Sequence, residues 1–547
     1  MTARSAWQHR PAGAQAPGRG RIGRRALLRM VPAVAGALVA TRAFAQTPRR
    51  GGTLRIQFSA IRQLDPYKTS GNNSEDNASS LVFDALVYLG RNFEPRPLLA
   101  ERWETPNSTT WVFRLRRNVM FQDDNPVFPK GSAREVTAED VVYSVNRFLK
   151  VSNAFTLGTV DSVRAVDRYT VELKKPSPDP FLLSDPNRMA RVMIVPHEAI
   201  EKLGEDGFAR QPVGSGPFKL RSFTANQTVV FDRNPSYWMP VYPDHVEFTY
   251  IPDPTVATIA LQGGRIDVLP YVANVDAVRQ LSGDPNLRLA SRGGSFRGLG
   301  FNVKTPPFNE LPVRDALAKA MDIDSAVRSV IAPYGERAYG QVPPWVPFGY
   351  DPSLKALWRY DPHAALDELA KAGFTEKNRD GILERNGTPL SFKIKVIAGA
   401  QVRVLTILVT QLRQMGIDAQ IQQQDVAVWA SDLIKGNETG VFFDFSYAGT
   451  TGLYELFGSA NIGKSNTHFY ANPKVDALFT AALVEPDAAR RSSLWKQAQR
   501  LIMEDRVVIP LYFERQYSAM NKRVVDWVVP WAPLRLESPE NNVYLTS

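Results

Sequence analysis

Apolar and polar residues alternate along this chain with two different periods. Runs with period two predict strands at Thr53–Phe58 and Thr110–Leu115. A capping-box pattern at Thr137–Asp140 predicts the start of a helix, and apolar residues at helical spacing predict further helix between Pro312 and Val330. Strands and helices continue to alternate, and no self-similarity of fixed period is present. The pattern is typical of layered α/β structure.

The second half of the chain continues this alternation. A helix is predicted to begin at Asp361-Pro362 and to end at Gly373, because glycine commonly follows the last turn of a helix. The later predicted elements are strands at 390–397 and 417–421, a helix at 402–415, and a helix that holds Val428, Trp429 and Leu433. Proline and glycine clusters at 212–217, 292–294 and 306–307 mark candidate boundaries between compact segments.

Charge is unevenly distributed. The net charge is +11, but residues 1–45 contain eight arginines and no acidic residue, so the remainder carries +3. No later run of lysine and arginine is long enough to neutralise a phosphate backbone, and we therefore expect no nucleic-acid partner.

Residues 1–45 have the composition of a targeting signal. They contain Arg24-Arg25, an apolar stretch from Val31 to Ala40 and the small-x-small sequence Ala43-Phe44-Ala45. We expect a cleaved signal peptide over 1–45; its paired arginines resemble a twin-arginine signal, and an ordinary secretory signal is the alternative. Both predict export to the periplasm.

The remaining sequence predicts a soluble protein without a lipid anchor. No later segment reaches the length of about 18 apolar residues that a membrane helix requires. Cysteine is absent, which excludes disulfides, a cysteine nucleophile and a lipidated cysteine.

Three short motifs suggest chemistry that their context does not support. Gly458–Ser465 matches the P-loop pattern, but the residues that follow it are poor helix formers, so we interpret it as a flexible, polar loop beside the ligand cleft. Asn378–Ile382 resembles half of a calcium loop, yet a hairpin turn is the preferred interpretation. Gly214-Ser215-Gly216 is not a nucleophile elbow, and its glycines are expected to serve backbone geometry. The five histidines are scattered, and we predict no metal site, no catalytic residue and no cofactor.

An ordered set of short motifs resembles the extracellular solute-binding proteins of family 5, which serve dipeptide, oligopeptide and nickel importers. The resemblance covers nearly all of the chain after the leader. The matching stretches are Gly51–Leu54, Leu64–Pro66, Leu98–Trp103, Thr137–Val141, Pro212–Phe218, Asn234–Trp238, Gly264–Val268, Phe301-Asn302, Pro307–Asn309, Val313–Leu317, Ala320–Asp322, Gly416-Ile417, Asn472–Asp476 and Ile509–Tyr512.

The resemblance implies a two-lobed periplasmic-binding-protein clamshell, type II, of the large peptide-binder subclass, with an extra inserted subdomain. Lobe I is expected to combine residues 46–82, 212–296 and 504–547, with 83–211 as the inserted subdomain of that lobe and 297–503 as lobe II. Two hinge segments are expected near Leu299–Asn302 and Val508–Tyr512. Closure of such lobes buries a ligand at their interface.

The family also points to a candidate ligand site. Its peptide-binding members carry an aromatic residue and then an acid that pairs with the peptide's ammonium group, on a segment whose counterpart here is Phe443–Tyr454. Tyr447 matches the aromatic residue, but Thr450 stands roughly where the acid is expected. A buried ammonium group without a counter-charge is costly, so a free peptide N-terminus is expected to bind poorly unless Asp444, Glu455 or an acid from the other lobe substitutes.

The hydroxyl and amide groups of Thr450, Thr451 and the 70–74 loop therefore favour a neutral or weakly charged solute that itself bears hydroxyl or amide groups. For the aromatic and apolar candidates a plain core role is the alternative, above all for Trp429 on its helix. The candidate ligand-binding residues are Trp429, Leu433, Tyr447, Thr450, Thr451, Tyr454, Ser70, Asn72 and Asn302.

The predicted function is the periplasmic substrate-binding component of an ABC importer, which captures a small solute, such as a peptide or another organic molecule, and is not an enzyme. Its expected partners are that solute and permease subunits with cytoplasmic ATPases, and the protein is expected to be a monomer. The alternatives are an extracytoplasmic hydrolase on an α/β scaffold and a periplasmic sensor or chaperone.

Overall fold

The computed structural model describes residues 48–69, 73–90, 93–152, 157–346, 348–397, 402–436, 440–446, 451–530, 533–538 and 541–546. The predicted signal peptide lies outside these residues. Among the described residues, no helix is both long enough and apolar enough to cross a membrane.

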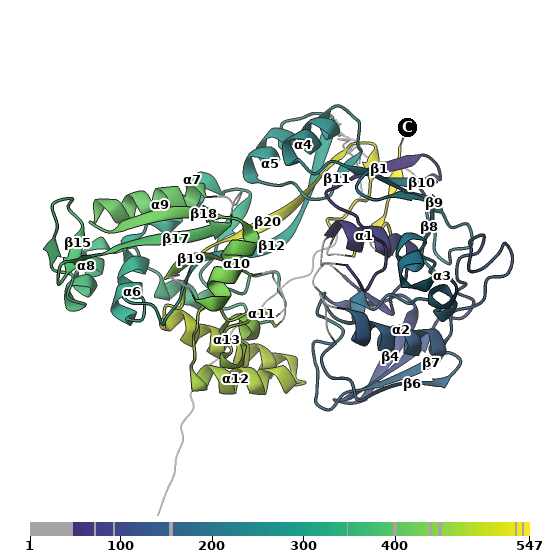
Figure 1. Ribbon diagram of the computed structural model, residues 1–547, viewed down its shortest axis with the longest axis horizontal. Coiled ribbons are helices and arrows are strands. Elements are labelled where there is room, and N and C mark those ends of the chain that lie inside the picture. Colours follow the sequence, from purple (N-terminus) through teal and green to yellow (C-terminus); the bar gives the residue numbers. More distant parts are fainter. Residues whose placement is uncertain are drawn as a thin grey trace, which may run out of the picture. The chain divides into compact units, whose positions relative to one another are not determined.

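Up to residue 301 the chain is rich in strands (Figure 1). The helices in this part are α1 (Asn73–Val82), α2 (Ala138–Val151), α3 (His197–Arg210), α4 (Pro254–Gln262) and α5 (Val275–Ser282). The strands are β1 (Thr53–Phe58), β2 (Val87–Leu89), β3 (Pro95–Pro97), β4 (Ala100–Asn107), β5 (Thr110–Leu115), β6 (Ser162–Asp167), β7 (Thr170–Lys174), β8 (Phe218–Thr224), β9 (Thr228–Arg233), β10 (His245–Tyr250), β11 (Val268–Leu269) and β12 (Leu287–Phe301).

After residue 301 the chain alternates helices and strands. The helices are α6 (Leu311–Ala320), α7 (Ile323–Val330), α8 (Pro362–Lys371), α9 (Arg403–Gln414), α10 (Val426–Lys435), α11 (Gly452–Phe457), α12 (Pro473–Val484) and α13 (Ala488–Glu504). The strands are β13 (Gly335–Arg337), β14 (Glu376–Lys377), β15 (Leu383–Arg385), β16 (Thr388–Pro389), β17 (Ser391–Ile397), β18 (Asp418–Gln424), β19 (Val441–Ser446), β20 (Val508–Asn521), β21 (Val524–Val525), β22 (Glu537–Ser538), β23 (Asn541–Asn542) and β24 (Tyr544–Leu545).

Several local predictions are confirmed. Strands β1 and β5 have the predicted bounds, and α2 begins after Thr137, whose N–H donates to the Asp140 carboxylate at 2.9 Å. The apolar stretch between Pro312 and Val330 forms two helices, because Asp322 caps a second one by accepting the N–H of Ser325.

One eleven-stranded sheet holds most of the long strands. Its order is β18-β17-β19-β12-β20-β11-β1-β10-β9-β8, with β13 paired to β20 off this path. Strand β1 runs parallel to both β10 and β11, whereas β12 and β20 are antiparallel and pair along nearly their whole length. These two long strands are therefore shared between the groups of strands on either side.

The shared β12–β20 ribbon is irregular near its middle. Its register shifts between Gly293 and Phe296 and again between Arg297 and Gly298. A Cβ at Gly294 would lie 2.8 Å from the Glu514 carbonyl oxygen, so only glycine allows this approach of the two strands.

A separate four-stranded sheet of order β4-β5-β7-β6 belongs to residues 100–174, and α2 lies along it (Figure 1). Its buried residues join a large hydrophobic core that also contains β1, β9 and β10. A different core fills the helices and strands between residues 299 and 512, and a third surrounds α11, α12 and α13. The apolar residues are thus divided among several compact cores.

Candidate functional site

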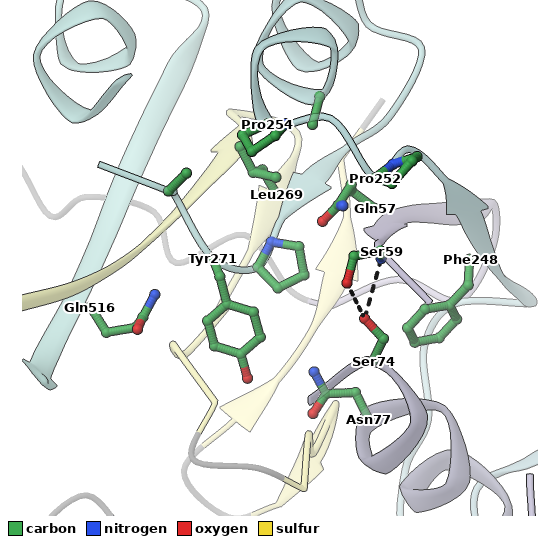
Figure 2. A pocket seen from close by; sticks show the side chains of 13 residues that line it. Gln57, Ser59, Ser74, Asn77, Phe248, Pro252, Pro254, Leu269, Tyr271 and Gln516 are labelled. Atoms are coloured by element: carbon green, nitrogen blue, oxygen red, sulfur yellow. Dashed lines mark hydrogen bonds between the residues drawn. The ribbon is translucent and has the colours of Figure 1, made fainter. Parts of the chain in front are cut away.

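The carboxyl ends of the parallel strands β1, β10 and β11 meet at one edge of the large sheet. In open α/β sheets, ligands bind outside such ends, where helices that follow the strands present their N-termini. Helix α1 follows β1 here, and α4 follows β10. A cavity of about 340 Å³ lies at this edge (Figure 2).

The lining of this cavity combines amide and hydroxyl groups with an apolar wall. Its polar side chains come from β1, α1, the segment after β11 and β20, which are distant in sequence. None of the described residues that line it is charged. The lining residues are Gln57, Ser59, Ser74, Asn77, Phe248, Pro252, Pro254, Ala257, Leu269, Pro270, Tyr271, Ala273 and Gln516.

Several of these polar groups are held by the fold. The Gln57 amide donates to the Ile251 carbonyl at 2.7 Å, and the hydroxyls of Ser59 and Ser74 lie 3.4 Å apart (Figure 2). The Asn77 side-chain oxygen accepts the N–H of Leu534 at 3.0 Å. These bonds fix the positions of the side chains before any solute arrives.

Tyr271 is the group at this site with the clearest capacity to bind. Burial raises the pKa of its hydroxyl, which therefore stays protonated and can donate a hydrogen bond. The Asn77 side chain lies near enough to this hydroxyl to oppose the shift, but within the described part of the chain no group meets full hydrogen-bond geometry with it. A solute that offers an acceptor would satisfy it.

A second cavity, of about 490 Å³, adjoins the first and shares Tyr271, Ala273 and Gln516 with it. Its lining is charged but paired. Arg297 donates to both carboxylate oxygens of Glu514, at 2.8 and 2.9 Å, and Arg403 pairs with Asp276. Arg515, which also lines this cavity, pairs with Glu336. Each charged lining residue among those described therefore has a partner of opposite charge.

The sequence-predicted residues of α10 lie together. Trp429 and Leu433 are buried against Phe442 of β19, and the Trp429 indole donates to the Lys395 carbonyl at 3.3 Å. This arrangement is consistent with a core role as well as with a wall beside the segment that follows β19.

Of the other described candidates, Asn302 lies beside the end of α10, because a Cβ at Gly436 would lie 3.2 Å from its side-chain nitrogen, whereas Thr451 and Tyr454 lie outside the cluster. Asn302 is buried and accepts the N–H of Lys304 at 3.0 Å, Thr451 donates to Glu455 at 2.9 Å, and the Tyr454 ring packs 5.8 Å from that of Phe479. The remaining four candidates, Ser70, Asn72, Tyr447 and Thr450, lie outside the described residues.

None of the described candidates lines either cavity. Sequence reasoning missed Gln57, Tyr271 and Gln516, which meet only in the folded sheet. Their position next to the carboxyl ends of strands was the signal that could have found the first two.

The acids considered as substitutes for Thr450 have partners. The Asp444 carboxylate is buried, accepts the Gln341 amide at 3.4 Å and lies 3.6 Å from the His468 imidazole. Glu455 is exposed and receives the Thr451 hydroxyl. Neither residue lines the cavity of Figure 2.

The P-loop match does not have P-loop structure. Helix α11 precedes Gly458–Ser465 in place of a strand, and the next helix, α12, begins only at Pro473. The buried Asn466 amide donates to the carbonyls of Gly458 and Tyr470 and holds the loop in shape. The segment is a loop, as the sequence predicts, but hydrogen bonds hold it in shape, and it lines neither cavity.

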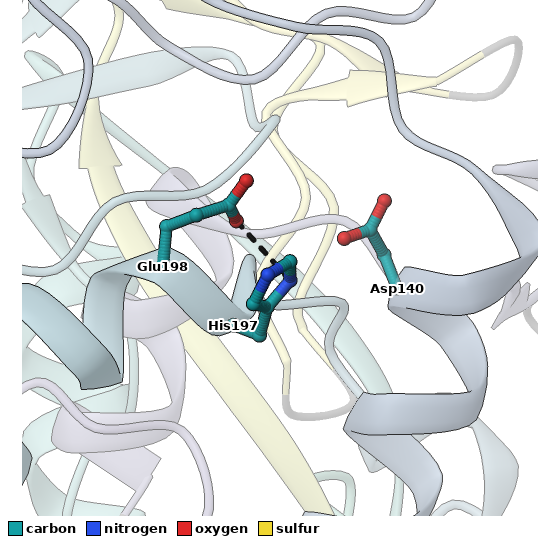
Figure 3. A group of neighbouring side chains, drawn as sticks. All are labelled: Asp140, His197 and Glu198. Carbon is teal, nitrogen blue, oxygen red and sulfur yellow. Dashed lines mark ion pairs between the residues drawn. The ribbon is translucent and has the colours of Figure 1, made fainter.

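Asp140, His197 and Glu198 are the one group among the described residues whose ligand atoms lie close enough to hold a metal ion (Figure 3). The two carboxylates are already engaged by Arg134, which donates to Asp140 at 2.7 and 2.8 Å and to Glu198 at 2.5 and 2.7 Å. Because both carboxylates already pair with this guanidinium, we interpret the group as an ion-pair cluster.

Ser215 is likewise structural. It is 1% exposed and donates to the Asp84 carboxylate at 3.0 Å, which also accepts from Tyr237 and Arg535. A Cβ at Gly214 or Gly216 would lie within 2.6 Å of the Val82 backbone. The two glycines allow the chain to pass against α1, as expected.

Comparison with known proteins identifies the family. The model of the middle region of the bacterial extracellular solute-binding proteins, family 5, matches residues 94–462. The chain belongs to this family. Its members are binding proteins that work with the membrane components of ABC importers, outside the cytoplasm, and this chain is accordingly a solute-binding component of such an importer.

Among the relatives is the glutathione-binding protein GsiB of Shigella flexneri serotype 5b, 29% identical over 494 residues that cover 86% of this chain and 91% of the relative. HbpA2 from Haemophilus parasuis has a similar structure, with a TM-score of 0.75, 25% identity and coverage of 91% of this chain and all of that one. NikA from Brucella suis, solved with Fe(III)-EDTA, gives a TM-score of 0.76 at 22% identity, covering 90% of this chain and 100% of that one. The predicted two-lobed periplasmic-binding-protein fold is thereby confirmed.

Proposed function

We propose that this solute-binding protein captures an organic solute rich in hydroxyl or amide groups and lacking a free ammonium group at the cavity of Figure 2. The observation that carries the proposal is the lining itself: Gln57, Ser59, Asn77, Tyr271 and Gln516 supply hydrogen bonds, and no described lining residue supplies a charge. A site built from neutral donors and acceptors leaves a buried charge on a solute uncompensated.

The domain division stays that expected from the sequence, with lobe I from residues 46–82, 212–296 and 504–547, the inserted subdomain at 83–211, and lobe II at 297–503. The separation of the core around β1, β9, β10 and the four-stranded sheet from the core between residues 299 and 512 supports the division into two lobes, whereas lobe I and the inserted subdomain share one core. We place the hinge at Gly293–Phe296 and Phe513–Gln516, because the ribbon shifts register there. Strand β19 pairs with β12 only from Phe296 onward, β13 pairs with β20 only up to Glu514, and β11 pairs with β20 only from Ala519 onward. This hinge lies a few residues from the segments expected from the sequence.

We also propose that the protein catalyses no reaction and needs no cofactor. It acts as a monomer in the periplasm, carries no lipid anchor and binds no nucleic acid. The residues that resembled catalytic or metal-binding motifs have structural partners, which supports the absence of chemistry. The candidate wall residues Trp429, Leu433, Tyr447, Thr450, Thr451, Tyr454, Ser70, Asn72 and Asn302 remain proposals for the surface that closes over the solute.

The relatives suggest which solutes to test first, because one is a glutathione-binding protein. Isothermal titration with reduced glutathione, a free tripeptide and the same tripeptide with an acetylated N-terminus separates charged from neutral ends. We expect the acetylated peptide to bind more tightly than the free one. Tighter binding of the free tripeptide would refute the proposal.

Substitution tests the assignment of the cavity. Tyr271→Phe removes the hydroxyl and is expected to weaken binding by roughly 5- to 20-fold, the effect of one buried hydrogen bond. Tyr360→Phe is the matched control, because Tyr360 is half exposed and lines neither cavity. Mass spectrometry of the solute after incubation tests catalysis, since any change in solute mass favours the hydrolase alternative.

A further inference from the structure

One phenylalanine of the proposed inserted subdomain lies in the core of the proposed lobe II. Phe181 is 1% exposed and belongs to a cluster of buried residues in which every other described member lies between Phe296 and Phe513. Its ring centroid is 5.3 Å from that of Phe348 and 6.3 Å from that of Trp495. The Arg491 guanidinium lies 5.4 Å from the same ring. Phe181 thus extends from the proposed inserted subdomain into an aromatic pocket of the proposed lobe II.

The turn that carries Phe181 is fixed from within its own subdomain. Asp179 accepts the Phe181 N–H at 3.2 Å and forms ion pairs with Lys175, at 2.8 Å, and with Arg188. The following residue, Leu182, is buried in the core of the N-terminal part of the chain. The side chain is therefore presented on a rigid support, with little conformational entropy left to lose on docking.

A second contact involves the same part of lobe II. Phe93, also 1% exposed, packs with Val346, and Trp345 and Phe348 lie against this pair. Trp345 in turn covers the hinge ribbon, because a Cβ at Gly293 would lie 2.2 Å from its indole ring. The segment 345–348, which packs against Phe181 and Phe93, is therefore also in contact with the proposed hinge.

We propose that Phe181, with Phe93, is a clasp by which the inserted subdomain holds the two lobes in the closed arrangement. The inference rests on the proposed closure of two lobes. Separation of lobe II from the subdomain has to withdraw the Phe181 ring into water, whereas closure buries it again. The clasp sets how much of the protein is closed, and a solute that binds only the closed form binds more weakly when the clasp is removed.

Spin labels on a chain without cysteine provide the test. Glu139→Cys on α2 and Lys496→Cys on α13 are both at exposed positions and give one label on each side of the clasp. Pulsed electron–electron double resonance then measures the distance between the two spin labels with no solute added. Short label distances report the closed form and long ones the open form. We expect Phe181→Ala to lower the ratio of the closed to the open population roughly ten- to hundred-fold, which is the effect of exposing one buried phenylalanine.

Phe128→Ala is the matched control. Phe128 is a buried residue of the same subdomain, but it stacks on Phe121, at 6.0 Å, within the N-terminal core. It should lower the unfolding temperature and leave the label separations unchanged. If Phe181→Ala, folded by circular dichroism, gives the wild-type separations, or if both variants shift them equally, the clasp is refuted.

A double substitution adds an independent readout. Phe181→Ala and Phe348→Ala remove the two sides of one contact, so together they should shift the separations little more than the larger single effect. Full additivity would contradict the proposal. Because no solute is present in either experiment, failure of the clasp is distinct from failure of the proposed solute class.

Discussion

A buried pair of carboxylates shares one arginine near the end of the chain, and this makes the stability of the protein depend on pH. Arg535 donates to Asp84 and to Glu537, each at 3.1 Å, and both acids are at most 1% exposed. One cation between two carboxylates leaves a negative charge uncompensated. Burial raises the pKa of Glu537 to about 7 from an ordinary value of 4.5, although Arg535 lowers it, and burial also raises the pKa of Asp84.

The sign of the effect follows from proton binding. Between pH 4.5 and about 7 the folded protein holds a proton on Glu537 that the unfolded chain releases, so the contribution of this group to stability is full below pH 4.5 and is lost as pH rises through 7. A shift of this size corresponds to about 3 kcal/mol. Glu537→Gln keeps the shape without the charge. The unfolding free energy of the variant minus that of the wild type should therefore rise by about 3 kcal/mol from pH 4.5 to pH 8.

Urea unfolding followed by tryptophan fluorescence at several pH values measures this difference. The control is Glu139→Gln, at an exposed position of α2, for which the difference between variant and wild type should be independent of pH. A Glu537→Gln difference that is the same at pH 4.5 and pH 8 would show that the carboxyl group does not hold a proton in the folded state.

Three further predictions concern stability and metal binding. Gly216→Ala places a Cβ 2.5 Å from the Val82 carbonyl carbon and should lower the unfolding free energy by about 2 kcal/mol or more, measured by urea unfolding; an unchanged midpoint would contradict the close approach. The Asp253 carboxylate caps α4 by accepting two backbone N–H groups at 2.8 Å. Asp253→Ala removes this cap and should lower the unfolding free energy by about 1 kcal/mol in the same assay, whereas Asp253→Asn should lower it less. Zinc titration of the wild type should give no heat at the Asp140 cluster, while Arg134→Ala frees its carboxylates and should create weak binding; tight zinc binding by the wild type would refute the ion-pair assignment.

Local signals in the sequence predicted local structure well. Asn378, in the segment that resembles a calcium loop, accepts the N–H groups of Asp380 and Ile382 at 3.0 Å, and the turn joins β14 to β15 as a hairpin, as predicted. The break between α6 and α7 was missed, because both helices carry the same apolar spacing and the cap at Asp322 is a single residue.

The candidate site was harder to predict, because it depends on pairings between distant segments. Leu299 pairs with Ile509, and Gln516 reaches the cavity beside Gln57 only after β20 has joined the sheet. Periodicity does not encode such partners. Family position supplied candidates mainly in lobe II, with Ser70 and Asn72 in lobe I, whereas the cavity at the β1, β10 and β11 edge is formed by residues that no single motif contains.

The position of β20 in the large sheet has a consequence for how the polypeptide folds during synthesis. Strand β11 forms its backbone pairs with Ala519 and Met520 on one side and with Ile56 of β1 on the other, and Arg523 binds Asp267 at 2.7 Å. Strand β11 therefore waits for β20, whose paired residues are made about 250 positions later, with an unpaired edge exposed to water meanwhile. Such a chain has high contact order, and we expect it to complete its first lobe only after most of its length has left the ribosome.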